Sequence, residues 1–148
     1  MGDKMKTIDL RSSLLSYVSR AHHKGAGYIE ELLRRKGIKN LAYSHIRIII
    51  ILSVHKRLSM KEISELIGKD KSTVTSLVNK LEKLGYVRKN PSIDDKRVIY
   101  LELEEKSEEI VASVFQVAAL FQEKVEGILT EEEMKTLLSL MEKLIKNF

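Results

Sequence analysis

Residues 59–103 read SMKEISELIGKDKSTVTSLVNKLEKLGYVRKNPSIDDKRVIYLEL, and this stretch decides the fold. A helix is predicted to begin after Ser59, because Ser59 and Glu62 have the spacing of a capping box. Gly68 ends that helix and permits a tight turn, and Asp70 caps the helix that follows. The pattern therefore predicts two short helices joined by a tight turn.

The second helix, which Gly85 closes, has two chemically different sides. At about 100° per residue its apolar side chains fall within a narrow arc: Val74, Leu77, Val78 and Leu81. The remaining surface carries hydroxyl, amide and amine groups: Ser72, Thr73, Thr75, Ser76, Asn79, Lys80 and Lys83. For any one of these residues a solvated helix face is an equally good explanation. Together they suit the major groove of DNA, where hydroxyls and amides contact base edges and Asn pairs with adenine.

A β-hairpin is predicted after this helix, with strands at 86–89 and 97–103. The connector at 90–95 is rich in turn residues and holds the only proline of the chain. The tip is basic and reads Asp95-Lys96-Arg97. Two helices, a glycine-containing turn and a hairpin with a basic tip predict a winged helix-turn-helix.

Helical periodicity continues on both sides of this unit. Helices are predicted at about 8–36, 43–55 and 105–127, and from a second capping box at Thr130 to the C-terminus. Gly25 and Gly27 interrupt the first of them, which implies a kink or the close approach of another helix. The expected fold class is mainly α with a small β-hairpin wing, in one compact domain.

The net charge of +5 is unevenly distributed along the chain. Residues 1–57 hold 12 Lys/Arg and 4 Asp/Glu, whereas residues 104–148 hold 5 and 10. A basic front and an acidic rear are expected to attract each other within one chain or between two. The terminal helices are also too apolar for a lone chain to cover, although an intramolecular bundle is the alternative. We therefore expect dimerisation helices at 1–36 and 105–148 and a DNA-binding lobe at 37–104.

Several classes of protein are disfavoured by the sequence. The chain has no cysteine, which excludes disulfides and thiolate chemistry, and no apolar run of the roughly 18 residues that span a membrane. No signal peptide precedes the first helix, so a cytoplasmic location is expected. There is no nucleophile–base pair, phosphate-binding glycine loop or metal motif, so we expect neither an enzyme nor a cofactor. His22 and His23 are adjacent and diverge on a helix, which argues against a metal site.

Residues 61–68 and 72–88, followed by Asp95-Lys96-Arg97, resemble the MarR family of transcriptional regulators. The resemblance covers about 45 residues, and the order of flanking helices extends it over nearly the whole chain. It implies a homodimer with intertwined terminal helices, in which Arg97 enters the minor groove and Asp95 holds the wing. One departure is Leu103-Glu104, where the family usually has Leu-Thr and the Thr caps the next helix.

The resemblance also implies a small aromatic or anionic effector, bound between the dimer helices and the DNA-binding lobe. The candidates by residue type and location are Tyr17, His22, His45 and Arg47. The alternative for each is a side chain whose hydrogen bonds are satisfied by its own backbone.

The expected function is that of a sequence-specific transcriptional regulator, a repressor that binds double-stranded DNA at a palindromic operator as a homodimer. The alternative is a winged-helix protein-interaction module without DNA sequence specificity. That alternative predicts an apolar patch on the second helix, whereas the sequence places Ser72, Ser76, Asn79 and Lys83 there.

Overall fold

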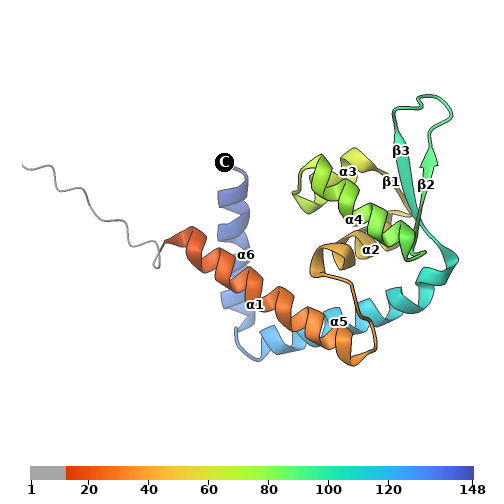
Figure 1. Cartoon of the computed structure of the whole chain (residues 1–148). Helices are drawn as coiled ribbons and strands as arrows, with labels where there is room; N and C mark the ends of the chain where they lie inside the picture. Colours follow the sequence, from red (N-terminus) through yellow and green to blue (C-terminus); the bar gives the residue numbers. More distant parts are fainter. Residues whose placement is uncertain (1–12) are drawn as a thin grey trace, which may run out of the picture.

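The computed structural model describes residues 13–148, which form helices around a small sheet (Figure 1). The elements in chain order are α1 (Leu14–Arg35), α2 (Tyr43–His55), β1 (Arg57–Ser59), α3 (Met60–Ile67), α4 (Lys71–Lys83), β2 (Val87–Pro91), β3 (Ile99–Leu103), a short 3-10 helix (Glu105–Ser107), α5 (Glu108–Glu126) and α6 (Glu131–Ile145). The predicted order of elements is confirmed, with one strand, β1, that the sequence pattern did not indicate. In the described part of the chain, no helix is both long and apolar enough to cross a membrane.

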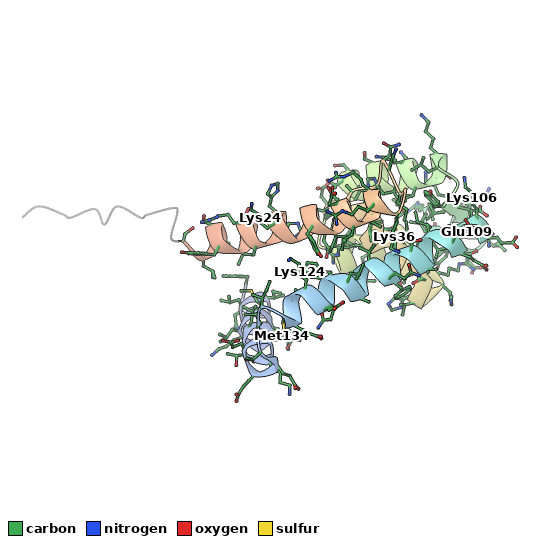
Figure 2. All side chains as sticks on the ribbon, turned by 90° about the horizontal axis from the view of Figure 1, so that it is seen from below. Lys24, Lys36, Lys106, Glu109, Lys124 and Met134 are labelled. Carbon is green, nitrogen blue, oxygen red and sulfur yellow. The ribbon has the colours of Figure 1, made fainter. Side chains whose placement is uncertain are left out.

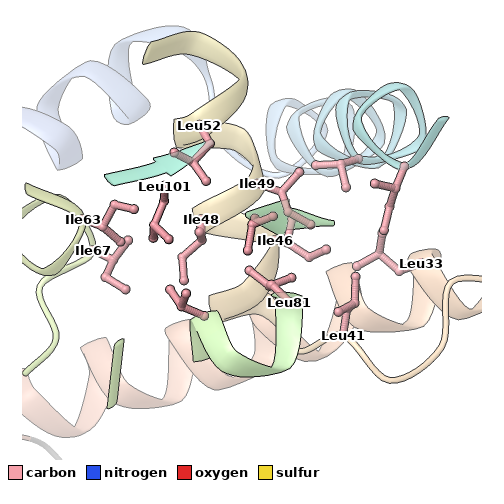
Figure 3. Packing of buried hydrophobic residues seen from close by; sticks show 14 of the residues in the cluster. Leu33, Leu41, Ile46, Ile48, Ile49, Leu52, Ile63, Ile67, Leu81 and Leu101 are labelled. Atoms are coloured by element: carbon pink, nitrogen blue, oxygen red, sulfur yellow. The ribbon is translucent and has the colours of Figure 1, made fainter. Parts of the chain in front are cut away.

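Helix α2 is the centre of the lobe formed by α2, α3, α4 and the sheet. Its apolar run covers most of the helix circumference, and Ile48 and Ile49 are fully buried, as the sequence predicted. Figure 3 shows these side chains packed among those of α3, α4 and β3, with Leu81 and Leu101 completing the cluster. Because one core serves all three helices, the position of α4 is fixed by packing rather than by its own helix propensity.

The sheet has three antiparallel strands in the order β1-β3-β2. Leu58 of β1 lies opposite Leu101 of β3, and both side chains are buried. The strands of the wing differ from the prediction, because Asn90 and Pro91 belong to β2 and β3 begins only at Ile99. Pro91 is tolerated there because the end of an edge strand does not need its N–H.

Helix α1 begins at Leu14, after Ser13, whose side chain accepts a hydrogen bond from the backbone N–H of Ser16. The sequence predicted a start at about residue 8; residues 8–12 lie outside the described part of the chain. The predicted close approach at Gly25 is confirmed, because a Cβ added there would lie 3.4 Å from the ring of Phe121 in α5. Nothing comparable lies near Gly27.

Helix α6 begins at the predicted capping box of Thr130 and Glu133 but buries no side chain. Figures 1 and 2 show it at the end of the molecule remote from α3, α4 and the sheet. A helix whose apolar side is mostly exposed gains little stability from packing within its own chain. The fold of one chain therefore leaves an apolar surface uncovered at this end.

Candidate nucleic-acid interface

Helix α4 packs one side into the lobe and leaves the other open. Val74, Val78 and Leu81 are buried against α2, α3 and the sheet. Of the predicted contact residues, five are exposed, namely Ser72, Ser76, Asn79, Lys80 and Lys83, and two are half-buried, namely Thr73 and Thr75. The wing formed by β2 and β3 stands beside α4 (Figure 1). The two parts predicted to contact DNA thus lie next to each other.

The first turn of α4 is organised by Asp70. Its Oδ1 accepts hydrogen bonds from the backbone N–H of Thr73 at 2.9 Å and from the hydroxyl of Ser72 at 2.6 Å, and its Oδ2 accepts from the hydroxyl of Thr73 at 2.7 Å. These hydrogen bonds, that from Ser72 first, hold the pKa of Asp70 well below its usual range. The carboxylate therefore occupies the N-terminus of the helix, and the hydroxyls of Ser72 and Thr73 keep only acceptor capacity for a ligand.

The hydroxyl of Thr75 also donates within its own chain, to the carbonyl of Lys71 at 2.8 Å. This back-bonding is common for threonine inside helices, and it uses the hydroxyl hydrogen that a ligand could otherwise accept. On the outward side of α4, the hydroxyl of Ser76 and the NH₂ group of Asn79 donate to no group among residues 13–148.

Lys89 of β2 is the residue of this surface that sequence reasoning missed. Its Nζ donates to Asn79 Oδ1 at 2.6 Å and forms an ion pair with Glu82 Oε2 at 2.7 Å. Strand alternation was the available signal, because it places Lys89 on the same side of β2 as the buried Val87. Lys89 thereby joins the wing to α4.

The loop of the wing is closed by hydrogen bonds around Asp95. The backbone N–H of Val98 donates to the carbonyl of Asp95 at 2.9 Å, and the backbone N–H of Arg97 donates to Asp95 Oδ1 at 2.9 Å. These two hydrogen bonds close the loop on Asp95. The side chains of Lys96 and Arg97 are exposed, and neither forms an ion pair with any of residues 13–148. The tip of the wing therefore carries two exposed cations.

The base of the wing is tied together by Glu102 of β3. This carboxylate pairs with Arg88 of β2 at 2.6 Å and with Arg57 of β1 at 3.6 Å, so one side chain connects all three strands. The guanidinium of Arg57 also lies 4.2 Å from the ring centroid of Tyr100. Arg88 lowers the pKa of Glu102, and Glu102 in turn raises the pKa of Arg88. Because about half of each arginine side chain is exposed, these ion pairs orient the strands more than they stabilise the fold.

Two of the predicted effector residues have contacts within the fold instead. Arg47 donates to the carbonyls of Ile67 at 2.9 Å and Leu66 at 3.0 Å, at the C-terminal end of α3. His45 is buried, and its Nδ1 accepts from the backbone N–H of Ala42 at 3.0 Å at the start of α2. Arg47 therefore donates to carbonyls at the end of α3 that have no partner within the helix. His45 likewise accepts from a backbone N–H at the start of α2 that has no partner within that helix.

We predict that His45 makes the fold sensitive to mild acid. Burial, with a smaller contribution from the charge of Lys80, lowers the pKa of His45 below its usual value of about 6.5. The unfolded chain then binds a proton more readily than the native chain, so stability is complete above about pH 6.5 and falls as the pH decreases from there. The midpoint of thermal unfolding, followed by circular dichroism, should drop between pH 7.5 and 5.5.

His45→Gln is the matched control, because a glutamine at the third helical position can accept the same backbone hydrogen bond and does not titrate. Its unfolding midpoint should change less over this range than that of the wild type. The other histidines at 22, 23 and 55 are exposed and are present in both proteins. Equal drops in the two proteins would contradict the assignment to His45.

A pocket of about 350 Å³ lies between α1, α2 and α5. His22 and Tyr43 meet edge to face in its wall, with ring centroids 5.7 Å apart, and Gln122 is the other polar side chain of the lining. Of the four predicted effector residues only His22 lines it; Tyr17 is exposed on α1 and takes no part. No Lys or Arg lines the pocket, so it suits a neutral aromatic molecule better than an anion. Among residues 13–148, no three His, Asp or Glu side chains gather in a group that could hold a metal ion.

Comparison with known proteins agrees with this geometry. A sequence profile of the MarR family matches residues 39–98, which span the lobe from the start of α2 to the wing. The HTH-type transcriptional regulator SarZ of Staphylococcus saprophyticus is 30% identical over 112 residues, which cover 74% of this chain and 72% of SarZ.

Two solved structures that contain DNA share the fold. The transcriptional repressor CouR, bound to a 23-mer DNA duplex, superposes with a TM-score of 0.80 at 17% identity, covering 97% of this chain and 99% of CouR. A mutant of MarR from E. coli, complexed with operator DNA, gives a TM-score of 0.79 at 18% identity, covering 88% of this chain and 92% of that mutant. On the family profile, the similarity to SarZ and the shared fold, the chain belongs to the MarR family of winged helix-turn-helix transcriptional regulators.

Proposed function

We propose that this chain is a sequence-specific DNA-binding repressor that acts in the cytoplasm as a homodimer on a palindromic operator. The observation that carries the proposal is the outward side of α4, which is polar, exposed and flanked by a basic wing tip. The relatives whose structures contain DNA support it, because CouR and the MarR mutant share the fold over most of their length.

The contact with DNA is proposed to have two parts. Helix α4 enters the major groove with the residues predicted above, and Ser76 and Asn79 face the bases. Arg97 enters the minor groove and Lys96 neutralises phosphate, since neither side chain has an acidic partner among residues 13–148. The narrow minor groove of A·T-rich DNA has an enhanced negative potential, which attracts a guanidinium.

The dimer is proposed to form through the helices at 1–36 and 105–148, with 37–104 as the DNA-binding lobe. The large exposed apolar residues of α1, α5, the turn between α5 and α6, α6 and the C-terminal end are Leu14, Leu15, Tyr17, Val18, Phe115, Leu120, Ile128, Leu137, Leu138, Leu140, Ile145 and Phe148. We propose that a second copy of the chain covers this surface, because the basic α1 of one copy can attract α6 of the other, which begins with three glutamates. Two lobes can then bind half-sites about one helical turn apart.

Release from DNA is proposed to follow the binding of a neutral aromatic effector in the pocket between α1, α2 and α5. The pocket is lined by α1 and α5, which are proposed to form the dimer interface, and by α2, which is the central helix of the lobe. A ligand that separates α2 from α5 would change the distance between the two lobes of the dimer. An effector can act in this way only by binding the two arrangements with different affinities.

The protein-interaction alternative is not favoured by the structure. A docking module of this fold needs an apolar patch on the outward side of α4, and the exposed residues there are Ser72, Ser76, Asn79 and Lys83. The exposed apolar residues instead lie mainly on the terminal helices.

Selection from a pool of random DNA duplexes tests the proposed function. We expect the full chain to enrich a palindrome and to bind it more weakly as salt increases, with a log–log slope of about −0.9 per neutralised phosphate. The slope is measured by fluorescence anisotropy on the enriched duplex. Failure to enrich any sequence, or binding that does not change with salt, would contradict the proposal.

A further inference from the structure

The amide of Asn79 on α4 is oriented before any DNA is bound. Lys89 Nζ lies 2.6 Å from Asn79 Oδ1, and an ammonium group only donates hydrogen bonds. The amide must therefore turn its oxygen towards Lys89. Its NH₂ group is left for an outside acceptor, since no residue in the described part of the chain accepts from it.

The fold holds Lys89 in this position. It lies in the middle of β2, paired with Leu101 of β3, and its side chain is only 24% exposed. Glu82, about one turn after Asn79 on α4, accepts from the same ammonium at 2.7 Å. Two contacts on α4 and a fixed strand position make the orientation of the amide a property of the free protein.

This orientation changes which base Asn79 can recognise. An asparagine with a free amide forms two hydrogen bonds with adenine, accepting from N6 and donating to N7. Here an ammonium group already donates to the accepting oxygen, and its charge disfavours the approach of the partly positive hydrogens on adenine N6. The hydrogens that remain on Asn79 and Lys89 are all donors, and guanine presents two acceptors, N7 and O6, side by side in the major groove.

We propose that Lys89 is a specificity-determining residue, which orients Asn79 as a donor and so selects a G·C base pair over an A·T pair at the position that Asn79 faces. This rests on the proposed function, in which α4 binds duplex DNA sequence-specifically. It also revises the pairing with adenine that the sequence alone indicated for Asn79.

The test is selection from random duplexes with the wild type, Asn79→Ala and Lys89→Met. Loss of base preference in Asn79→Ala identifies the position that Asn79 faces. The wild type is expected to enrich G·C at that position. Lys89→Met frees the amide oxygen, so A·T should gain about tenfold relative to G·C there, with the other positions unchanged.

Two control variants separate this effect from a general loss of charge. Lys61→Met removes an exposed lysine from α3 and should leave G·C in place. Glu82→Gln keeps the contact between Lys89 and Asn79 and should also retain G·C. Thermal unfolding of each variant confirms that it is folded. A wild-type preference for A·T at the position of Asn79 overturns the inference even if Lys89→Met does not fold.

The outcomes distinguish the inference from the proposed function. If the wild type enriches no sequence, both fail. If it enriches a sequence with a pair other than G·C at the position of Asn79, or if folded Lys89→Met keeps the wild-type preference, the inference alone is overturned.

Discussion

Replacing Arg97 with alanine is expected to weaken binding to the selected operator by about 100-fold. An arginine that contacts bases contributes roughly 1–3 kcal/mol, and a dimer loses two of them. The effect should fall on DNA binding alone, because the backbone N–H of Arg97, not its side chain, holds the wing loop to Asp95. Anisotropy titrations at one fixed salt concentration measure the loss, and thermal unfolding should be unchanged.

Arg35→Ala is the matched control for this experiment. Arg35 is the last residue of α1, and its side chain pairs with Glu31 at 3.1 Å. This end of α1 lies on the side of the molecule opposite the tip of the wing (Figure 1). Operator affinity should stay within about twofold of the wild type, because Arg35 lies away from the proposed DNA surface. The fold should also be unaffected, since one exposed ion pair contributes little to stability. Equal losses in the two variants would show that Arg97 acts only through the net charge.

The double replacement of Leu138 and Ile145 by aspartate is expected to separate the proposed dimer into chains of 17.0 kDa. Both side chains are more than half exposed in a single chain, so the change should leave the fold of that chain intact. In the dimer the same positions would bury unpaired carboxylates, which costs several kcal/mol for each. Sedimentation equilibrium gives the mass, and operator affinity should fall on the order of 100-fold once the two lobes are no longer linked.

Val54→Asp provides the corresponding control. Val54 lies in the last turn of α2, and its side chain is about as exposed as those of the two replaced residues. It belongs to the lobe and not to the terminal helices. This variant should remain a dimer. A dimer that survives the double replacement would show that α6 does not form the interface.

The parts of the fold that the sequence predicted are those set by local rules. The capping boxes at Ser59 and Thr130 both form as expected, and Gly68 and Gly85 adopt positive φ where the helices end. The two sides of α4 also follow from periodicity alone, because Val74 faces the core and the residues on the opposite side are exposed. These features depend on neighbours within a few positions along the chain.

The features that the sequence did not predict depend on contacts between distant segments. Strand β1 has only three residues, and its pairing with β3 is a tertiary contact that no periodicity reveals. Residue type and location predict Arg47 as an effector contact, but the position of its guanidinium is set by the packing of α2 against α3. Lys89 likewise reaches Asn79 only because the wing folds back beside α4. Residue type alone could not distinguish a structural role from a binding role at these positions.

Methylation interference on the selected operator tests the central claim most directly. Dimethyl sulfate methylates guanine N7 in the major groove and adenine N3 in the minor groove, so one experiment examines the sites of both α4 and the wing. The account predicts that methyl groups in both grooves block binding, in two symmetric sets about one helical turn apart, and that Arg97→Ala removes only the minor-groove set. Operator fragments that bind equally well with either groove methylated would contradict it.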